Sequence, residues 1–198
     1  MGENLANAGV FLIQTFFGLY ILVVIMRFLM QSARVDFYNP ISQGIVTITD
    51  PALRPLRRFI PGIYGVDLSI LVLALVLQLI ALVLIIALKG FSVPNPLLLL
   101  AWSLLGMFAL ILDIYFFALL IMVVSSWLAP QSNHPVLMLI YQLTLPLCNP
   151  ARKLIPPMGG LDISIILVFV AITLIDSFLV VEPMRQLLAC PKGLILGL

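Results

Sequence analysis

The sequence predicts an all-α membrane protein with four transmembrane helices in two parallel two-helix repeats, each with a short interfacial helix and a Pro/Arg loop. Three observations support this prediction. The chain of 198 residues is 63% hydrophobic and only 9% charged, with a mean hydropathy of +1.25, whereas about 25% of residues are charged in soluble domains. A motif of prolines and basic residues occurs twice, at a constant offset of 95 residues. Four apolar stretches reach the roughly 20 residues that a membrane span needs: about 9–31, 66–88, 97–128 and 163–181.

The first stretch is expected to stay in the protein as a helix and not to be cleaved as a signal peptide. Its short head contains Glu3 but neither Lys nor Arg, and no small-x-small cleavage site follows it. The first repeat occupies 1–90, the second occupies 97–184 in the same order, and 185–198 forms a C-terminal tail. Because each repeat has an even number of spans, both insert the same way up and are parallel.

After the first span of each repeat comes a segment that is too short to cross a bilayer. In 41–49, isoleucines recur at helical spacing, and Asn39 suits an N-cap because proline follows at the first helical position. The equivalent segment, 136–144, follows a His-Pro pair that begins at His134. Both segments are expected to be interfacial or shallow re-entrant helices, because backbone groups at that depth need internal hydrogen bonds.

The repeated motif reads P-A-L-R-P-L-R-R-F-I-P at 51–61 and P-L-C-N-P-A-R-K-L-I-P at 146–156. Because each proline fixes its φ angle, we expect a rigid basic loop that follows the same path in both repeats. The cations of this loop either contact lipid headgroups, where each charge gains about 1 kcal/mol from anionic lipid, or belong to a shaped docking surface for a partner. These cations are Arg54, Arg57, Arg58, Arg152 and Lys153.

An aspartate follows each basic loop, two residues before a serine and just ahead of a long apolar run. Asp67 and Asp162 thus occupy the position of helix N-caps, where a carboxylate accepts hydrogen bonds from free amide groups and favours the positive end of the helix. The alternative is a salt bridge to the neighbouring basic residues, which would tie the loop to the helix.

The distribution of Lys and Arg predicts the orientation in the membrane. The side of the basic loops also holds Arg27 and Arg34, whereas the opposite side holds only Lys89, Arg185 and Lys192. By the positive-inside rule, the basic loops are expected to be cytoplasmic and both termini to lie outside.

Four polar side chains lie at broadly similar depth within the predicted spans: Gln14, Gln78, Asp113 and Asp176. A carboxylate in the bilayer costs about 2.5–3.5 kcal/mol on insertion scales, so both aspartates are expected to face the bundle or a cavity. One hypothesis is a proton or cation site. The other is polar contact between helices, either within the chain or with the helix of a partner.

Catalysis, metal binding and nucleic-acid binding have little support in the sequence. His134 is the only histidine, and no nucleophile elbow, phosphate loop or zinc-ligand spacing is present. Cys148 and Cys190 fall on opposite faces of the predicted topology, so no disulfide between them is expected. A formal charge of +2 is too small to indicate nucleic acid. We therefore predict no enzyme activity, no cofactor and no metal, with membrane lipids and other membrane proteins or a second copy as partners.

The two copies of the motif extend beyond the prolines and arginines. In the first copy they comprise Asn39, Pro40, Ile41, Thr49, Pro51, Pro55, Arg57, Arg58, Ile60, Pro61, Gly65, Asp67 and Ser69. In the second they comprise Pro135, Thr144, Pro146, Pro150, Arg152, Lys153, Ile155, Pro156, Gly160, Asp162 and Ser164. This doubled pattern closely resembles the YggT family, called YlmG in Gram-positive bacteria, and covers both halves of the chain. The second copy departs from the pattern at His134 and Lys153, which replace asparagine and arginine.

The two-repeat form is similar to the inner-membrane protein of Gram-negative bacteria, so the resemblance implies a bacterial inner-membrane location. Members of the family have been linked to tolerance of osmotic or salt stress, to cell division and nucleoid organisation, and in plastids to haem attachment on cytochrome b6. The resemblance supplies no catalytic residues. It implies a non-enzymatic accessory or assembly factor that supports envelope or osmotic-stress homeostasis through its Pro/Arg loops and helix faces. The alternative is a small oligomeric ion channel or transporter that uses Asp113 and Asp176.

Overall fold

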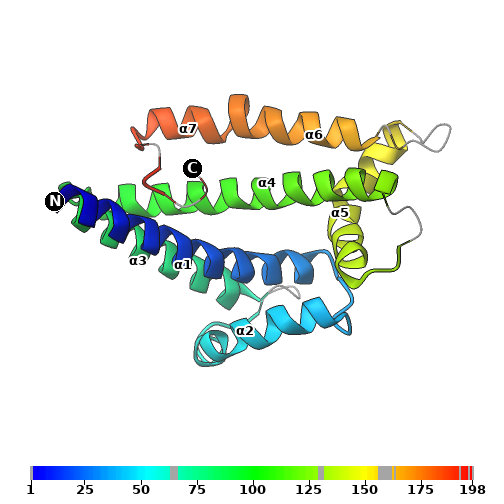
Figure 1. Cartoon of the computed structure of the whole chain (residues 1–198), viewed down its shortest axis with the longest axis horizontal. Helices are drawn as coiled ribbons and strands as arrows, with labels where there is room; N and C mark the ends of the chain where they lie inside the picture. The colour runs from blue at the N-terminus through cyan, green and yellow to red at the C-terminus, as the bar shows by residue number, and fades with distance from the viewer. Residues whose placement is uncertain are drawn as a thin grey trace.

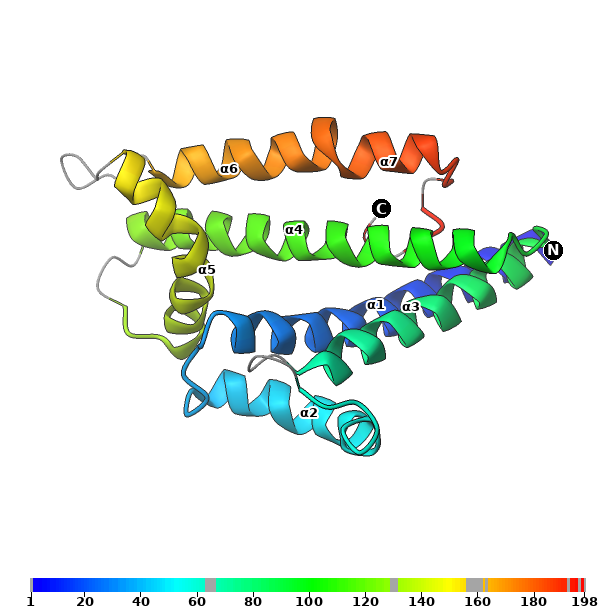
Figure 2. The ribbon, with the colours of Figure 1, turned by 180° about the vertical axis from the view of Figure 1, so that it is seen from behind.

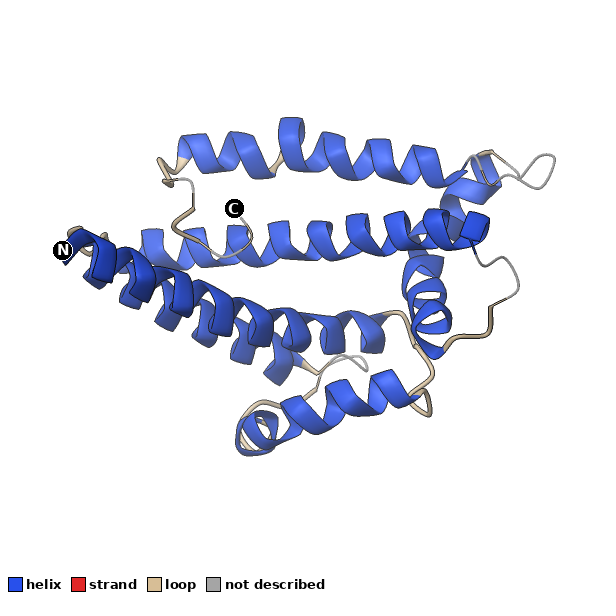
Figure 3. Ribbon diagram, in the orientation of Figure 1, coloured by secondary structure: helices blue, strands red, loops and turns tan. Residues whose placement is uncertain are grey.

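All the regular secondary structure in the part of the chain that the computed structural model describes is helical, and loops join the helices (Figures 1 and 3). Four residues named above lie outside the described part: Gly65, Pro156, Gly160 and Lys192. The described residues are 2–62, 67–128, 132–155, 162, 164–191, 193–195 and 197.

The first repeat consists of α1 (Gly2–Ser32), α2 (Pro40–Leu56) and α3 (Leu68–Lys89). Figures 1 and 2 show α1 and α3 side by side along the bundle, and their contact is the most extensive between any two described elements. Gly90 ends α3 with a φ of 68°, which a residue without a Cβ adopts at little cost.

The second repeat consists of α4, α5 and a final helix in three parts. Figure 1 shows that α1 and α4 both run toward the end of the bundle that holds α2 and α5, so the two repeats have the same orientation. The predicted all-α fold with two parallel repeats is confirmed. The elements are α4 (Pro96–Leu128), α5 (Pro135–Leu154), α6 (Ser164–Leu174), the π-helical η1 (Ile175–Leu179) and α7 (Val181–Leu187).

The lengths of the long helices place α2 and α5 at the membrane surface. The shortest candidate span has 22 residues, which corresponds to about 33 Å at 1.5 Å per residue, close to the roughly 30 Å of the hydrocarbon core. The ends of α3, which forms this span, therefore reach the headgroups. α2 is the helix that comes before the first of these ends in the chain. The four candidate spans are Asn4–Ser32, Leu68–Lys89, Pro96–Leu128 and Ser164–Leu187.

The prediction of a Pro/Arg loop holds for the arginines of the first repeat, because Arg57 and Arg58 follow the end of α2. It is wrong for the prolines of both repeats and for Arg152 and Lys153, which are helical. The motif prolines lie inside the helices, which extend beyond the predicted 41–49 and 136–144. In each helix the two prolines are four residues apart and exposed, so they share the outer face. The carbonyl groups that they leave without an amide partner lie on the same face, within reach of interface water. The four prolines are Pro51, Pro55, Pro146 and Pro150.

The interruption of the last helix has a local cause in Pro183. Its ring would clash with the carbonyl group of Leu179 in a continuous α-helix, and it has no amide proton. Val180 leaves the helical region, with φ −128° and ψ −64°, and its N–H donates to the carbonyl of Ile175 at 2.9 Å. The helix thus absorbs one extra residue as a π-bulge next to Asp176.

Apolar side chains from both repeats form the central core. The cluster joins Ile25 of α1 and Leu73 of α3 to Met107 of α4, and it is closed at one end by Leu53 of α2 and Leu143 of α5. At membrane depth the stabilisation comes from close packing rather than from exclusion of water, since lipid tails are equally apolar. This core therefore holds the two repeats together.

Candidate functional site

The helices α2 and α5, which we together call the platform, are joined to each other at one end of the bundle (Figure 1). Asn39 caps α2, and its Nδ2 donates to the carbonyl of Pro135, at the start of α5, at 2.7 Å. The N–H of Asp36 donates to Oε1 of Gln142 in α5 at 2.9 Å. Because these bonds cross between repeats, the platform is a single surface to which both repeats contribute.

Arg27 of α1 fixes α2 to the bundle. Arg27 is 7% exposed, and its guanidinium group donates to Oγ1 of Thr49 at 2.6 Å and to the carbonyl of Val46 at 3.1 Å. It also pairs with the carboxylate of Asp50 at 2.7 Å. Sequence reasoning missed this contact, although an arginine inside a span requires a polar partner. The sequence signal that could have predicted this partner is the polar pair Thr49-Asp50, next to the apolar face of α2.

Asp50 extends this contact into a network across three helices. Its carboxylate lies 3.5 Å from Nη1 of Arg57 and 3.7 Å from Nη2 of Arg54, and Arg57 in turn pairs with Asp67 at 2.7 Å. The hydrogen bond from Arg27 holds the pKa of Asp50 below its usual value, against the opposing effect of desolvation. α1, α2 and the start of α3 are thus fastened by alternating charges.

Asp67 forms both of the contacts that the sequence offered as alternatives. Its Oδ1 accepts from the N–H of Ser69 at 3.1 Å as the N-cap of α3, while its Oδ2 accepts from Arg57. Asp162 does the same in the second repeat, with Ser164 N–H at 3.1 Å and Arg152 at 2.8 Å. Partial burial opposes ionisation of both carboxyl groups, but hydrogen bonds from the serine and the arginine hold each pKa below its usual value.

The second repeat lacks the ionic contact between its long helix and its platform helix. At the offset of 95 residues, Met122 stands in the place of Arg27 and Leu145 in the place of Asp50. Thr144, the equivalent of Thr49, places its Oγ1 3.4 Å from the sulfur of Met122. The two repeats therefore share the helix cap and the arginine pair but not the fastening of the platform helix.

The predicted basic residues separate into two groups. Arg57 and Arg152 are held in ion pairs, so they are structural. Arg54, whose side chain is 76% exposed, forms a longer ion pair with Asp50, at 3.7 Å. Arg58 and Lys153 are exposed and, among the described residues, form no ion pair, so these two are the cations available to a lipid or a protein partner.

The four intramembrane polar residues do not form one site. Gln14 donates to the carbonyl of Gly193 in the C-terminal tail at 2.8 Å. Gln78 of α3 is buried. Asp113 and Asp176 interact electrostatically across α4 and η1. Contrary to expectation, Asp113 is exposed and Asp176 is only half-buried.

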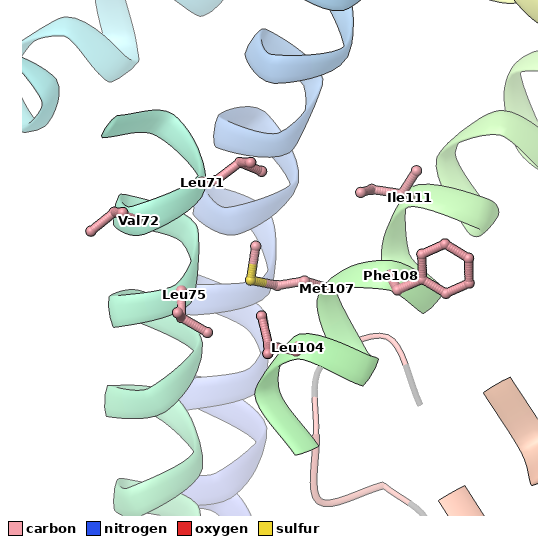
Figure 4. A pocket seen from close by; sticks show the side chains of 7 residues that line it. All are labelled: Leu71, Val72, Leu75, Leu104, Met107, Phe108 and Ile111. Atoms are coloured by element: carbon pink, nitrogen blue, oxygen red, sulfur yellow. The ribbon is translucent and has the colours of Figure 1, made fainter. Parts of the chain in front are cut away.

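An apolar groove opens between α3 and α4, with a volume of about 240 Å³ (Figure 4). Its walls present no polar side chain, and neither aspartate lines it, so it suits a hydrocarbon group and offers no chemistry. The lining residues are Leu71, Val72, Leu75, Leu104, Met107, Phe108 and Ile111.

After α7 the described residues 188–191, 193–195 and 197 return into the bundle. We call them the strap, and sequence reasoning left them without a role. Trp102 of α4 donates to the carbonyl of Leu188 at 3.1 Å, and Gln14 of α1 binds the strap at Gly193. Gly197 lies so close to α4 that a Cβ atom would be 2.6 Å from the carbonyl oxygen of Gly106. The strap thus contacts both repeats at the end opposite the platform.

The cysteines and the histidine occupy structural positions. Both cysteines are free and buried, Cys148 in the platform and Cys190 in the strap, at opposite ends of the bundle. Nδ1 of His134 accepts from the N–H of Val136 at 3.4 Å as the N-cap of α5. Within the described ranges, no three His, Cys, Asp or Glu side chains gather as metal ligands.

The sequence matches known proteins over both repeats. The chain is 45% identical over 192 residues to "Uncharacterized protein PA0392" of Pseudomonas aeruginosa, which covers 96% of this chain and 97% of that protein. It is 37% identical over 158 residues to "Uncharacterized protein YggT" of Escherichia coli, covering 80% of this chain and 81% of that one. No solved structure matches the chain. The CCB3/YggT family model matches residues 6–88 and again 101–182. This protein is therefore a multi-pass membrane protein of the CCB3/YggT family, with one family segment in each of its repeats.

Proposed function

We propose that this protein is a non-enzymatic accessory or assembly factor of the bacterial inner membrane, which holds other membrane proteins through the platform and neighbouring helix faces. In this role it supports envelope or osmotic-stress homeostasis. The main support is the direct joining of α2 to α5 by the hydrogen bonds of Asn39 and Gln142. A preformed surface suits such a role, because it loses little conformational freedom when a partner binds.

The arrangement of charges supports a holding role rather than a catalytic one. Arg27, Asp50, Arg57 and Asp67 interact with one another in one network, and these contacts fix the positions of three helices. In this proposal the network and the platform lie on the cytoplasmic side, which the distribution of Lys and Arg favours. A partner would then meet the platform at the cytoplasmic headgroups.

The test is the mass and composition of the complex extracted from native membranes in a mild, neutral detergent. We expect a foreign subunit at fixed stoichiometry. Asn39→Ala with Gln142→Ala, which removes the two hydrogen bonds between the start of α2 and α5, should release this subunit and impair growth under salt stress. Thr47→Ala, an exposed change on α2, is the matched control. A homo-oligomer with no other subunit would contradict the proposal.

The second candidate is a small oligomeric channel or transporter that uses Asp113 and Asp176. It is favoured by one observation, the electrostatic interaction of these carboxylates, which belong to two different candidate spans. Two close carboxylates hold protons or a cation more readily than one. Asp113→Asn with Asp176→Asn should then abolish proton or cation flux into liposomes. If the protein is an assembly factor instead, this aspartate variant should still bind the foreign subunit and still support growth under salt stress.

A further inference from the structure

Each repeat presents an exposed cation followed by an exposed apolar side chain. Phe59, next to Arg58, is 81% exposed, and Leu154, next to Lys153, is 75% exposed. The two dipeptides are separated by the same offset of 95 residues as the rest of the repeat. Among the residues that the structure describes, neither Arg58 nor Lys153 forms an ion pair.

The preceding arginine fixes the depth of each dipeptide. Arg57 pairs with Asp67 at the first turn of α3, and Arg152 pairs with Asp162 ahead of α6. Because these spans begin at the edge of the hydrocarbon core, the dipeptides are held at the boundary between headgroups and acyl chains.

We propose that Arg58-Phe59 and Lys153-Leu154 are twin lipid anchors on the cytoplasmic leaflet. In each, the cation binds the phosphate of an anionic phospholipid, and the apolar side chain inserts among the acyl chains below it. This inference deepens the proposed function by naming the lipid class at the edge of the platform. A cation beside an apolar group at this depth is the arrangement by which interfacial segments hold an anionic membrane.

The two anchors differ in their chemistry. Arg58 offers a planar fork that binds phosphate in a bidentate manner, whereas Lys153 offers a compact point charge. The first repeat should therefore hold its lipid longer. Arg54 is excluded from the pattern, because it lies near Asp50 and its register equivalent is the uncharged Asn149.

The test uses the full chain purified in neutral detergent and measures retained phosphatidylglycerol and phosphatidylcholine by native mass spectrometry. Arg58→Gln with Lys153→Gln should weaken phosphatidylglycerol binding roughly five-fold per cation, or about 25-fold in total, without changing phosphatidylcholine. Arg54→Gln with Lys89→Gln removes the same formal charge and should retain phosphatidylglycerol as the parent does. Phe59→Ser with Leu154→Ser should weaken both lipids.

Two results would overturn the inference. The first is unchanged phosphatidylglycerol binding by the Arg58 and Lys153 variant, and the second is an equal loss in the charge-matched control. If the foreign subunit is lost while the lipid stays, the dipeptides dock a protein, and the proposed function survives without the anchors. An unchanged thermal unfolding midpoint shows that a variant is folded. If the double variant does not fold, either single variant takes its place, and its expected loss of phosphatidylglycerol binding is roughly five-fold.

Discussion

Arg27 of α1 and Asp50 of α2 form an ion pair at 2.7 Å that the second repeat replaces with Met122 and Leu145. The same duplicated scaffold thus fastens one platform helix by charge and the other by apolar packing. A buried ion pair recovers little more than its desolvation cost, but either partner left alone is strongly unfavourable. The ionic fastening of α2 therefore defines its position more than it adds to stability.

Arg27→Met should destabilise the protein by roughly 3–5 kcal/mol, because it removes one partner of a largely buried pair. Arg27→Met with Asp50→Leu, which copies the second repeat, should recover much of that loss, since no carboxylate then remains without its main partner. The measurement is equilibrium unfolding in mixed micelles. A double variant no more stable than the single one would contradict the proposed equivalence of the two fastenings.

Substitutions at Asp67 should separate its two contacts. Asp67→Asn keeps a good N-cap acceptor for α3 but loses the ion pair to Arg57, whereas Asp67→Ala loses both. The alanine variant should be less stable than the asparagine variant by about 1 kcal/mol, the usual contribution of a cap. The same ranking should hold at Asp162, and equal stability of the two variants at either site would show that the cap contributes nothing.

Sequence reasoning identified the features that depend on local pattern. The four spans follow from apolar length, and the duplicated cap at Asp67 and Asp162 follows from an aspartate placed before an apolar run. The proline segments were misassigned, because proline alone argues against a helix interior. The packing of their inner face on the bundle outweighs that local preference, and such packing is not visible in a single segment.

Contacts between distant segments were the part that the sequence could not supply. The pairing of Arg27 with Asp50 depends on how α2 folds back on α1, and the position of the strap depends on apolar side chains that α1, α3 and α4 present together. The exposure of Asp113 likewise depends on which face of α4 the neighbouring helices cover, and a single segment does not show this.

Acid should destabilise the platform end. The pKa values of Asp50, Asp67 and Asp162 lie below their usual range in the folded protein. The stabilisation by these carboxylates is therefore complete above the unfolded value, near about pH 4, and is lost as the pH falls through the lowered folded values. The thermal unfolding midpoint should therefore decrease when the pH is lowered below about 4. This decrease should be less steep in the variant Asp67→Asn with Asp162→Asn. A midpoint that is flat or rises on acidification would contradict this assignment.

The strap should stabilise the end of the bundle opposite the platform. Leu194 is 2% exposed and packs with α1, α3 and α4. Leu194→Ala should cost about 2–5 kcal/mol, the usual range for a buried leucine. Leu187→Ala is the matched control, because Leu187 is 78% exposed and only seven residues earlier. Equal unfolding free energies for the two variants would show that the strap does not pack on the bundle.

Cys190 offers a direct readout of strap opening in the same variants. Burial raises the pKa of its thiol to about 11, so little thiolate exists near neutral pH and the sulfur reacts slowly with maleimide. In a Cys148→Ser background, Leu194→Ala should increase the labelling rate at Cys190, because a loosened strap hydrates the thiol and lowers its pKa. Leu187→Ala should leave the rate unchanged. Fast labelling of Cys190 in the parent would place the strap outside the bundle.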